Sequence, residues 1–414
     1  MRTVDAAGLK IGDEHPPRIM GVLNVSKESP YDPSVFDDPG DAAEYVDEEL
    51  IDEGADIVDV GLESANKRFE VLSAEQELDR LDTAVETLES VSGDAIFSIE
   101  TRYHEVADAA LSQGFDMVND ICGFADPEMP RVCSEHDVAV AKMASPPDLT
   151  RPGAIEDVDD IYDALGLNGF TDKTIVDPAF GGWSEAKTLE DDRETFRRLR
   201  EFRGLGYPIL VSINRKNFLR SVAGRSTEEA LPVSLAATSM AVERGAHIIR
   251  THDVAETRDA ALIGKEFARD RLREHRTGDV GIEELDVTTT REAERHLERI
   301  GGSSESAGGE SDPRTASATT VVRVFELTGL SDGNVGVLST AAAEVGVTVV
   351  SAGSAAPNQS VLADGNGNFS ATDSTGRTAV VFGTPRALTA LDDAVDDQSA
   401  GLADALRRIS ASLA

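Results

Sequence analysis

The sequence predicts a (β/α)8 barrel followed by a linker and a small C-terminal α/β domain. Within about the first 270 residues, eight short apolar segments alternate with amphipathic helical segments, and this alternation is typical of a parallel sheet. Eight such units at this length favour a closed barrel. The rival, an open doubly wound sheet, would carry a glycine-rich phosphate loop after its first strand, where this chain has none. We therefore expect a barrel at residues 1–275, a helical extension and linker at 276–318, and a small α/β domain at 319–414.

The elements of the predicted barrel follow one another at regular spacing. Its strands are expected to begin near residues 18, 56, 95, 116, 138, 173, 208 and 246. Ala43, Val46 and Leu50 lie at helical spacing after the first strand, and Gly54 ends that helix. Ser73 and Gln76 form a capping box that opens the second helix. Further helices are expected at 103–113, 189–203, 227–244 and 256–273.

The C-terminal part has a different composition. Residues 301–318 are rich in Gly, Ser and acidic residues, which predicts a flexible linker. Beyond it we expect strands at 319–325, 347–350 and 378–382, helices near 334–344, 385–396 and 400–412, and a loop at 358–376. This domain shows no cluster of catalytic residue types, so oligomerisation, partner docking and ligand sensing all remain open for it.

The charge of the chain excludes several functions. Its 77 acidic and 39 basic side chains give a formal charge of −38, which argues against binding to nucleic acid or to an anionic membrane. Such an acidic surface with few Lys is typical of a halophilic protein, and in about 1 M salt the screening length falls to about 3 Å, so a ligand must be held by direct contacts. The two Cys form no metal or disulfide pattern. Without an apolar run of membrane length or a signal peptide at Met1–Lys10, a cytoplasmic location is expected.

Polar side chains follow the predicted strands at their carboxyl ends, where barrels of this type carry their chemistry. We expect ten of them to surround one opening: Asn24, Glu63, Glu100, Asn119, Asp120, Lys142, Asp177, Lys216, Arg250 and His252. Carboxylates and amides there could hydrogen-bond an amide-like heterocycle. Taken singly, each could instead cap a helix, and Asp120 and Ser64 are examples.

Four of the groups after the last two strands are cationic or can become so. These are Arg215, Lys216, Arg250 and His252, and in so acidic a chain they indicate an anion such as phosphate or pyrophosphate. The alternative is a set of ordinary ion pairs with carboxylates. Lys216 is the more informative because the chain has only eight Lys.

Several stretches resemble the dihydropteroate synthases and the wider pterin-binding barrel family. They are 20–25, 56–61, 118–121, 176–178, 206–211, 215–216 and 244–257, in the order of the family. The resemblance implies a transferase of folate synthesis that joins a dihydropterin-methyl pyrophosphate to p-aminobenzoate and releases pyrophosphate with the help of Mg²⁺. A homodimer is expected, with these small molecules as its partners.

The resemblance also implies roles for single residues. Glu100, Asn119, Met143, Asp177 and Lys216 would contact the pterin. Arg250 and His252 would bind the pyrophosphate, and Asn24 would help to hold the magnesium ion and the pyrophosphate. Lys216, Asp177 and Arg250 would be the catalytic residues.

The chain departs from the family in the loops after its first, second and sixth strands, at 24–30, 61–68 and 179–183. Glu100 stands where the family has Asp, and Lys142 where it has His. The first two loops shape the aminobenzoate pocket in the family. This leaves two alternatives open: a divergent relative that uses another arylamine, and a non-catalytic pterin-binding partner of a working synthase. A pterin-dependent methyltransferase is disfavoured because it has no need of an Arg and His pair at a pyrophosphate position.

Overall fold

The computed structural model describes most of the chain in two compact units, Met1–Asp286 and Val287–Ala414. The described residues are 1–25, 34–63, 71–181, 184, 186–272, 275–277, 280–300, 313–351, 360–363, 369–372, 377–395 and 400–413. The first unit thus continues past the boundary expected at residue 275. Helix α10 (Thr290–Arg299), which was expected to precede the small domain, falls within the second unit.

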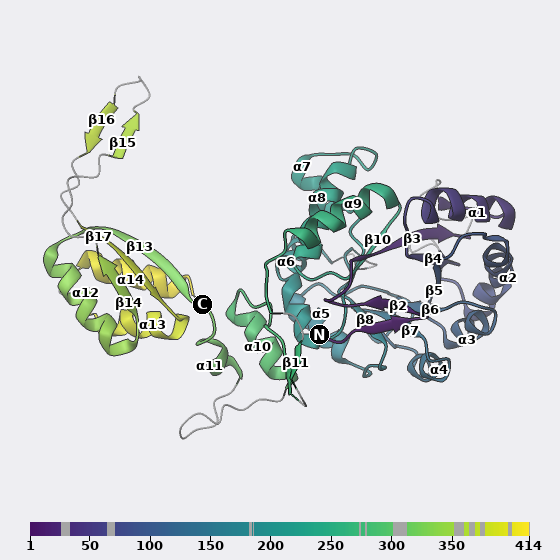
Figure 1. The fold of residues 1–414 in the computed structure, drawn as a ribbon, viewed down its shortest axis with the longest axis horizontal. Helices are drawn as coiled ribbons and strands as arrows, with labels where there is room; N and C mark the ends of the chain where they lie inside the picture. The colour runs from purple at the N-terminus through teal and green to yellow at the C-terminus, as the bar shows by residue number, and fades with distance from the viewer. Residues whose placement is uncertain are drawn as a thin grey trace. The chain divides into compact units, whose positions relative to one another are not determined.

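The first unit is the predicted (β/α)8 barrel (Figure 1). Its eight parallel strands are β3 (Arg18–Asn24), β4 (Ile57–Gly61), β5 (Ile96–Thr101), β6 (Met117–Asp120), β7 (Ala139–Met143), β8 (Thr174–Asp177), β9 (Leu210–Val211) and β10 (Ile248–Thr251). They run side by side in the order β8-β7-β6-β5-β4-β3-β10-β9. A parallel bridge between Val176 and Ile209 joins β8 to β9 and so closes the sheet.

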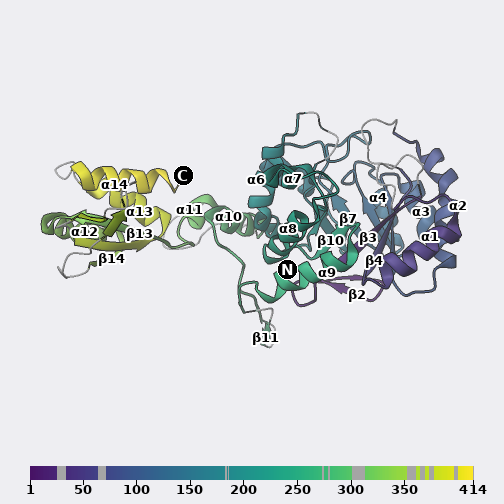
Figure 2. The ribbon, with the colours of Figure 1, turned by 90° about the horizontal axis from the view of Figure 1, so that it is seen from above.

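Helices lie around the outside of these strands in both views (Figure 2). They are α1 (Pro39–Tyr45), which a π-helix continues to Ile51, α2 (Ala74–Ser90), α3 (His104–Ser112), α4 (Met129–Glu135), α5 (Val158–Gly166), α6 (Leu189–Arg197), α7 (Asn217–Ala223), α8 (Leu231–Glu243) and α9 (Val254–Glu266). The capping box of Ser73 and Gln76 at the start of α2 is confirmed.

The two faces of each strand have different surroundings. Outward residues such as Val58, Val118 and Val176 pack with the helices in the main core. Inward residues form a smaller apolar cluster of Met20, Ile57, Met117, Ala139, Ala141, Ile175, Leu210 and Ile248. An N-terminal hairpin, β1 (Val4–Ala6) and β2 (Leu9–Ile11), adds Val4, Ala6 and Ile11 to this cluster. The hairpin, which the sequence did not predict, therefore closes the amino end of the barrel.

Asp13, just after this hairpin, is the centre of a buried ionic network at the same end. Its carboxylate lies 2.8 Å from Arg203, 3.0 Å from Arg271 and 3.0 Å from Nε2 of His247. Burial alone would raise the pKa of Asp13, but His247 and Arg203 outweigh burial and lower it far below its usual range. The network joins the hairpin, β10 and the segment after α9.

The second unit contains an antiparallel sheet of β13 (Arg323–Leu330), β17 (Arg377–Gly383) and β14 (Thr348–Ser351), in that order. Its core includes residues of α12 (Asp332–Val345), α13 (Pro385–Ala394) and α14 (Ala400–Ala411). The expectation of a loop throughout 358–376 is wrong, since β15 (Ser360–Ala363) pairs with β16 (Phe369–Thr372). In the part of the chain that is described, no helix is long and apolar enough to cross a membrane.

Candidate active site

The inner face of the barrel changes from apolar to polar toward the carboxyl ends of the strands. Asp59 follows Ile57 on the inner face of β4, Asn119 follows Met117 on β6, and Asp177 follows Ile175 on β8. Glu100 pairs in register with Gly61 and Asn119, which places all three positions on one face. The alternation of strand side chains therefore collects these polar groups inside the barrel.

Arg250, on β10, is the cation at the centre of this group. Its Nε donates to Asp59 over 2.7 Å, and its Nη2 donates to Glu100 over 2.7 Å. Asp59 is fully buried and also accepts a hydrogen bond of 2.9 Å from Asn119. Burial raises the pKa of Glu100, the nearby charge of Asp59 adds to that rise, and Arg250 opposes it. In this state Arg250 is thus turned toward carboxylates inside the barrel.

Asp177 and Lys216 approach the same space from β8 and from the turn after β9. Asp177 is 4% exposed and accepts a hydrogen bond of 2.8 Å from the backbone of Ala179. Burial raises its pKa to about 6. Burial and the charge of Arg250 lower the pKa of Lys216, while Asp192 and Asp177 act in the opposite direction.

A cavity of about 240 Å³ opens beside Lys216. It is lined by Val22, Ser212, Asn214, Arg215, Lys216, Thr227, Arg250, Thr251 and His252. Burial and the charge of Arg250 lower the pKa of His252 to about 3, so its imidazole is neutral near pH 7 when the cavity holds no anion. A bound anion would offset the neighbouring positive charges and favour the protonated form.

Arg215, also at this cavity, is fixed by its neighbours. Its guanidinium lies 2.7 Å from Asp253 and donates to the carbonyls of Thr227 and Glu228. The alternative of an ordinary ion pair therefore applies to Arg215.

Asn24, at the end of β3, lies next to Glu100 across Gly61. Its amide nitrogen donates to Ser34 over 3.0 Å. A Cβ built on Gly61 would lie 3.2 Å from Oδ1 of Asn24 and 3.8 Å from Oε1 of Glu100. The absence of a side chain at Gly61 thus leaves space that an amide oxygen and a carboxylate oxygen both border.

Lys142 does not lie in the site, and the prediction that it surrounds the opening was wrong. Its ammonium group donates to the carbonyls of Leu165, Leu167 and Gly169 at and beyond the end of α5. It also lies 4.7 Å from the ring centre of Phe124 and 4.9 Å from that of Phe170. The side chain is fully buried, and burial lowers its pKa to about 8.

The same correction applies to Asp120. It accepts hydrogen bonds from the backbone of Cys122 and Phe124, so it caps the turn after β6. The physical reason is register: Asp120 and Lys142 are paired with each other, on the face opposite to Asn119. Met143, the neighbour of Lys142, pairs with Asp177 and shares its inner face.

Glu63 binds residues of the neighbouring loops and does not line the cavity. Its carboxylate accepts from the backbone of Leu72 over 2.9 Å and forms a buried ion pair with Arg102. Arg102 also donates to the carbonyl of Leu149 over 2.9 Å. Glu63 and Arg102 therefore hold together the segments that follow β4, β5 and β7.

Three residues that sequence reasoning did not place in the site contact its members or the turn beside them. The sequence prediction included Asp59 in an apolar strand without giving it a role. Because Asp59 comes two residues after the apolar Ile57, strand alternation places both side chains on the same face, the inner one. Lys187 precedes α6 and Asp192 lies in it, and both hold the turn after β8. The altered loop residues 26–30, 64–68 and 182–183 lie outside the described residues.

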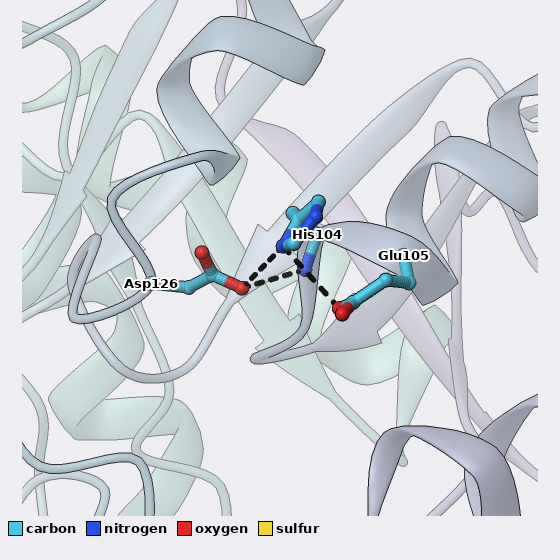
Figure 3. Close-up of side chains that lie close together, drawn as sticks. All are labelled: His104, Glu105 and Asp126. Atoms are coloured by element: carbon cyan, nitrogen blue, oxygen red, sulfur yellow. Dashed lines mark hydrogen bonds and ion pairs between the residues drawn. The ribbon is translucent and has the colours of Figure 1, made fainter.

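A separate cluster lies just after β5, at the start of α3 (Figure 3). Nδ1 of His104 is 2.8 Å from Asp126 and 3.3 Å from Glu105. Asp126 also accepts from the backbone N–H groups of His104 and Glu128. These bonds give the cluster a structural role, because Asp126 satisfies the amino end of α3 from a neighbouring loop.

Comparisons with known proteins agree with this geometry. A family model described as pterin binding enzyme matches residues 20–252. A dihydropteroate synthase of Bacillus subtilis is 32% identical over 244 residues, which is 58% of this chain and 84% of the relative. A probable bifunctional folylpolyglutamate synthase/dihydropteroate synthase of Haloferax volcanii is 36% identical over 251 residues, or 58% of this chain and 29% of that protein.

Solved structures give the same result. A dihydropteroate synthase of Clostridium difficile, solved in the presence of pteroic acid, has a TM-score of 0.55 and 29% identity, and covers 63% of this chain and 99% of its own. One from Thermus thermophilus in complex with 6HMPPP has a TM-score of 0.52 and 28% identity, over 64% of this chain and all of its own. The family match spans more than half of the chain and includes every predicted site residue from Asn24 to His252, so the chain belongs to the pterin binding enzyme family.

Proposed function

We propose that the barrel unit is a dihydropteroate synthase, a transferase that joins a dihydropterin-methyl pyrophosphate to p-aminobenzoate and releases pyrophosphate. The observation that supports this most strongly is the juxtaposition of two kinds of group. The amide of Asn119 and the carboxylate of Asp177 are buried inside the barrel beside the nearly buried Glu100, and Lys216, Arg250 and His252 line the adjoining cavity. A heterocycle with an anionic tail needs both.

The inner polar groups suit the pterin ring. The ring presents N–H donors on one edge, and Asp177 and Glu100 supply carboxylate acceptors for them. Lys216 can donate to a carbonyl oxygen or ring nitrogen, and the amide of Asn119 can both donate and accept. Because these groups are held by burial and by hydrogen bonds such as those from Arg250 and Ala179, they are preorganised before the ring arrives.

The cavity groups suit the leaving group. Departure of pyrophosphate leaves positive charge on the pterin methylene and collects negative charge on the phosphates. Carboxylates near the ring stabilise the first charge, and Lys216 and protonated His252 stabilise the second. Arg250 can contribute its remaining N–H groups, while Asp59 and Glu100 fix the direction of its guanidinium.

The residues at Asn24 also fit a magnesium ion. Mg²⁺ prefers oxygen ligands and commonly uses one or two protein oxygens together with phosphate oxygens and water. Oδ1 of Asn24 lies on the side of Gly61, with a carboxylate oxygen of Glu100 nearby, and Asn24 would hold the ion. When bound, the ion would neutralise part of the charge on the leaving pyrophosphate.

The direct test is turnover. The purified full chain is incubated over a range of KCl concentrations with dihydropterin-methyl pyrophosphate, p-aminobenzoate and Mg²⁺, and both products are measured. Appearance of dihydropteroate with an equal amount of pyrophosphate is expected, with the highest rate in concentrated salt, as the formal charge of −38 suggests. If neither product appears at any salt concentration, the assignment is wrong.

The same assay separates the alternatives that the altered loops raise. Pyrophosphate release with another arylamine only would identify a divergent synthase. Binding of the pterin substrate without release of pyrophosphate would identify a non-catalytic partner. Size-exclusion chromatography with light scattering would test the homodimer that we propose for the active form.

A further inference from the structure

The turn that follows β8 is held in a strained conformation at the edge of the site. Ala179 has a φ of 60°, in the left-handed region, and Gly181 has a φ of 77°. A residue with a side chain in this region costs of order 1 kcal/mol or more, so the surroundings of Ala179 must hold it there. The backbone N–H of Ala179 is also the group that binds the carboxylate of Asp177.

Lys187 and Asp192 bind this turn at two points. Nζ of Lys187 donates to the carbonyl of Ala179 over 2.7 Å. Oδ1 of Asp192 accepts from the backbone N–H of Gly181 over 2.9 Å and lies 3.4 Å from Nζ of Lys187. The side chains are 3% and 8% exposed, so this is a buried ion pair with its hydrogen bonds made to the turn.

The turn lies beside Lys216. A Cβ built on Gly181 would lie 3.5 Å from Nζ of Lys216, so the space next to Gly181 is bounded by that ammonium group. The charge of Asp192 raises the pKa of Lys216, and the charge of Lys187 lowers it. The pair therefore borders both Asp177 and Lys216 without lining the cavity described above.

We infer that Lys187 and Asp192 are positioning residues for the proposed transfer reaction, which hold the Ala179–Gly181 turn so that Asp177 and Lys216 face the ligand. This inference rests on the proposed function. Loss of either side chain would release the strained turn. Loss of Asp192 would lower the pKa of Lys216, and loss of Lys187 would raise it.

The other charged groups that act on the pKa of Lys216 are the same in both variants of the pair. They are Arg250 on β10, Asp177 on β8, Glu100 on β5 and His252 after β10. Asp192→Asn keeps an acceptor for Gly181 but removes a negative charge, which lowers the pKa of Lys216 further. Lys187→Met removes a positive charge, which raises it.

The experiment measures kcat/KM against pH for both variants with dihydropterin-methyl pyrophosphate and p-aminobenzoate. Both variants are expected to lose about 10- to 100-fold at pH 7, as for a small displacement of catalytic groups. The alkaline limb of the profile should move to lower pH in Asp192→Asn and to higher pH in Lys187→Met. If the two residues only stabilise the fold, the alkaline limbs of the two variants should not move in opposite directions. If both limbs coincide with that of the wild type, the inference is overturned.

Two further variants keep the test decisive. Asp191→Ala, on the same helix, removes the capping contact with Thr188 and should lower the melting temperature without moving the alkaline limb. Ala179→Gly removes the strain at a positive φ, so adding it to Asp192→Asn should recover part of the lost rate and leave the limb shifted. Failure of this recovery would show that the turn is not the means of action.

Failure of the proposed function is recognised separately. If the wild type forms no product, binding of inorganic pyrophosphate is measured by calorimetry over the same pH range, because it depends on the charge of Lys216 whatever the reaction is. The same opposite shifts are then expected in the affinity, and their absence overturns the positioning role.

Discussion

Arg250 lies 2.7 Å from Glu100, and this ion pair ties β10 to β5 across the inside of the barrel. A second ion pair of 2.7 Å joins Arg250 to the fully buried Asp59. One guanidinium thus compensates two carboxylates in a recessed site. Arg250 therefore matters for stability as well as for ligand binding, because its removal leaves the negative charges of Asp59 and Glu100 inside the barrel without their cationic partner.

Arg250→Ala is therefore expected to lower the stability of the ligand-free protein as well as abolish activity. Removing one partner of a buried ion pair costs about 3 to 5 kcal/mol. Urea unfolding in fixed salt measures the loss, and adding Glu100→Gln to the variant should recover part of it. The control is Arg131→Ala, whose pairs with Glu128 and Glu135 are solvent-exposed, so this change should cost much less stability than Arg250→Ala. Equal losses in Arg250→Ala and Arg131→Ala would contradict this account.

Lys142→Met is expected to affect stability but not catalysis. The ammonium group of Lys142 satisfies three carbonyls beyond β7, and their loss should cost about 2 to 4 kcal/mol. The turnover rate at a temperature where both proteins are folded should be unchanged. A large fall in kcat for the folded variant would return Lys142 to the site.

The pH dependence of the same pair of proteins gives a second measurement. The pKa of Lys142 is about 8 in the folded state, against an ordinary value of 10.5. Between these values the unfolded chain binds more protons, so the free energy of unfolding of the wild type rises with pH. Relative to Lys142→Met, the wild type should thus gain stability from pH 8 toward pH 10.5, and an opposite slope would show that the ammonium form is the favoured one.

The error at Lys142 shows what sequence patterns can and cannot determine. The eight strands were predicted within about two residues of their starts because apolar runs and flanking helices mark them strongly. Which face a residue near a strand end occupies depends on one residue of register, and β7 continues through Lys142 to Met143. The predicted barrel likewise placed Asn119 and Asp177 near Arg250, because all three lie at the carboxyl ends of strands. The hydrogen bond from Arg250 to Asp59 could not be predicted from the sequence.

The hairpin β1–β2 was missed for a different reason. Its strands have three residues each, too short for a periodic pattern, and only their packing under the barrel reveals them. Asp192 and Lys187 could not be assigned from sequence either, because a charged residue on a helix is usually solvated and only burial distinguishes this pair.

His104 should contribute to stability in a pH-dependent way. Burial lowers its pKa, but the hydrogen bond and the charge of Asp126 outweigh burial and raise it above 6.5. The contribution is fully present below pH 6.5 and is lost as pH rises through the raised pKa. The stability difference between wild type and His104→Ala should thus shrink as pH rises from 6 to 9. A difference that grows over this range would contradict the ion pair in Figure 3.

Lys216→Ala is the variant that tests the placement of the site as a whole. Its ammonium group adjoins the cavity, next to Arg250 and Asp177, where one charge-assisted contact to the ligand is expected. Loss of that contact in a partly dry site should weaken binding or turnover of the pterin pyrophosphate by about 2 to 4 kcal/mol. The melting temperature should change little, because burial beside Arg250 already disfavours the charged form of Lys216.

The matched control is Lys173→Ala, just before β8 at the opposite end of the barrel, where Lys173 lies 2.9 Å from the exposed Asp137. That change should alter neither turnover nor stability by more than about 1 kcal/mol. If the two variants lose activity equally, or if Lys216→Ala mainly unfolds the protein, the chemistry does not lie at the carboxyl end of this barrel.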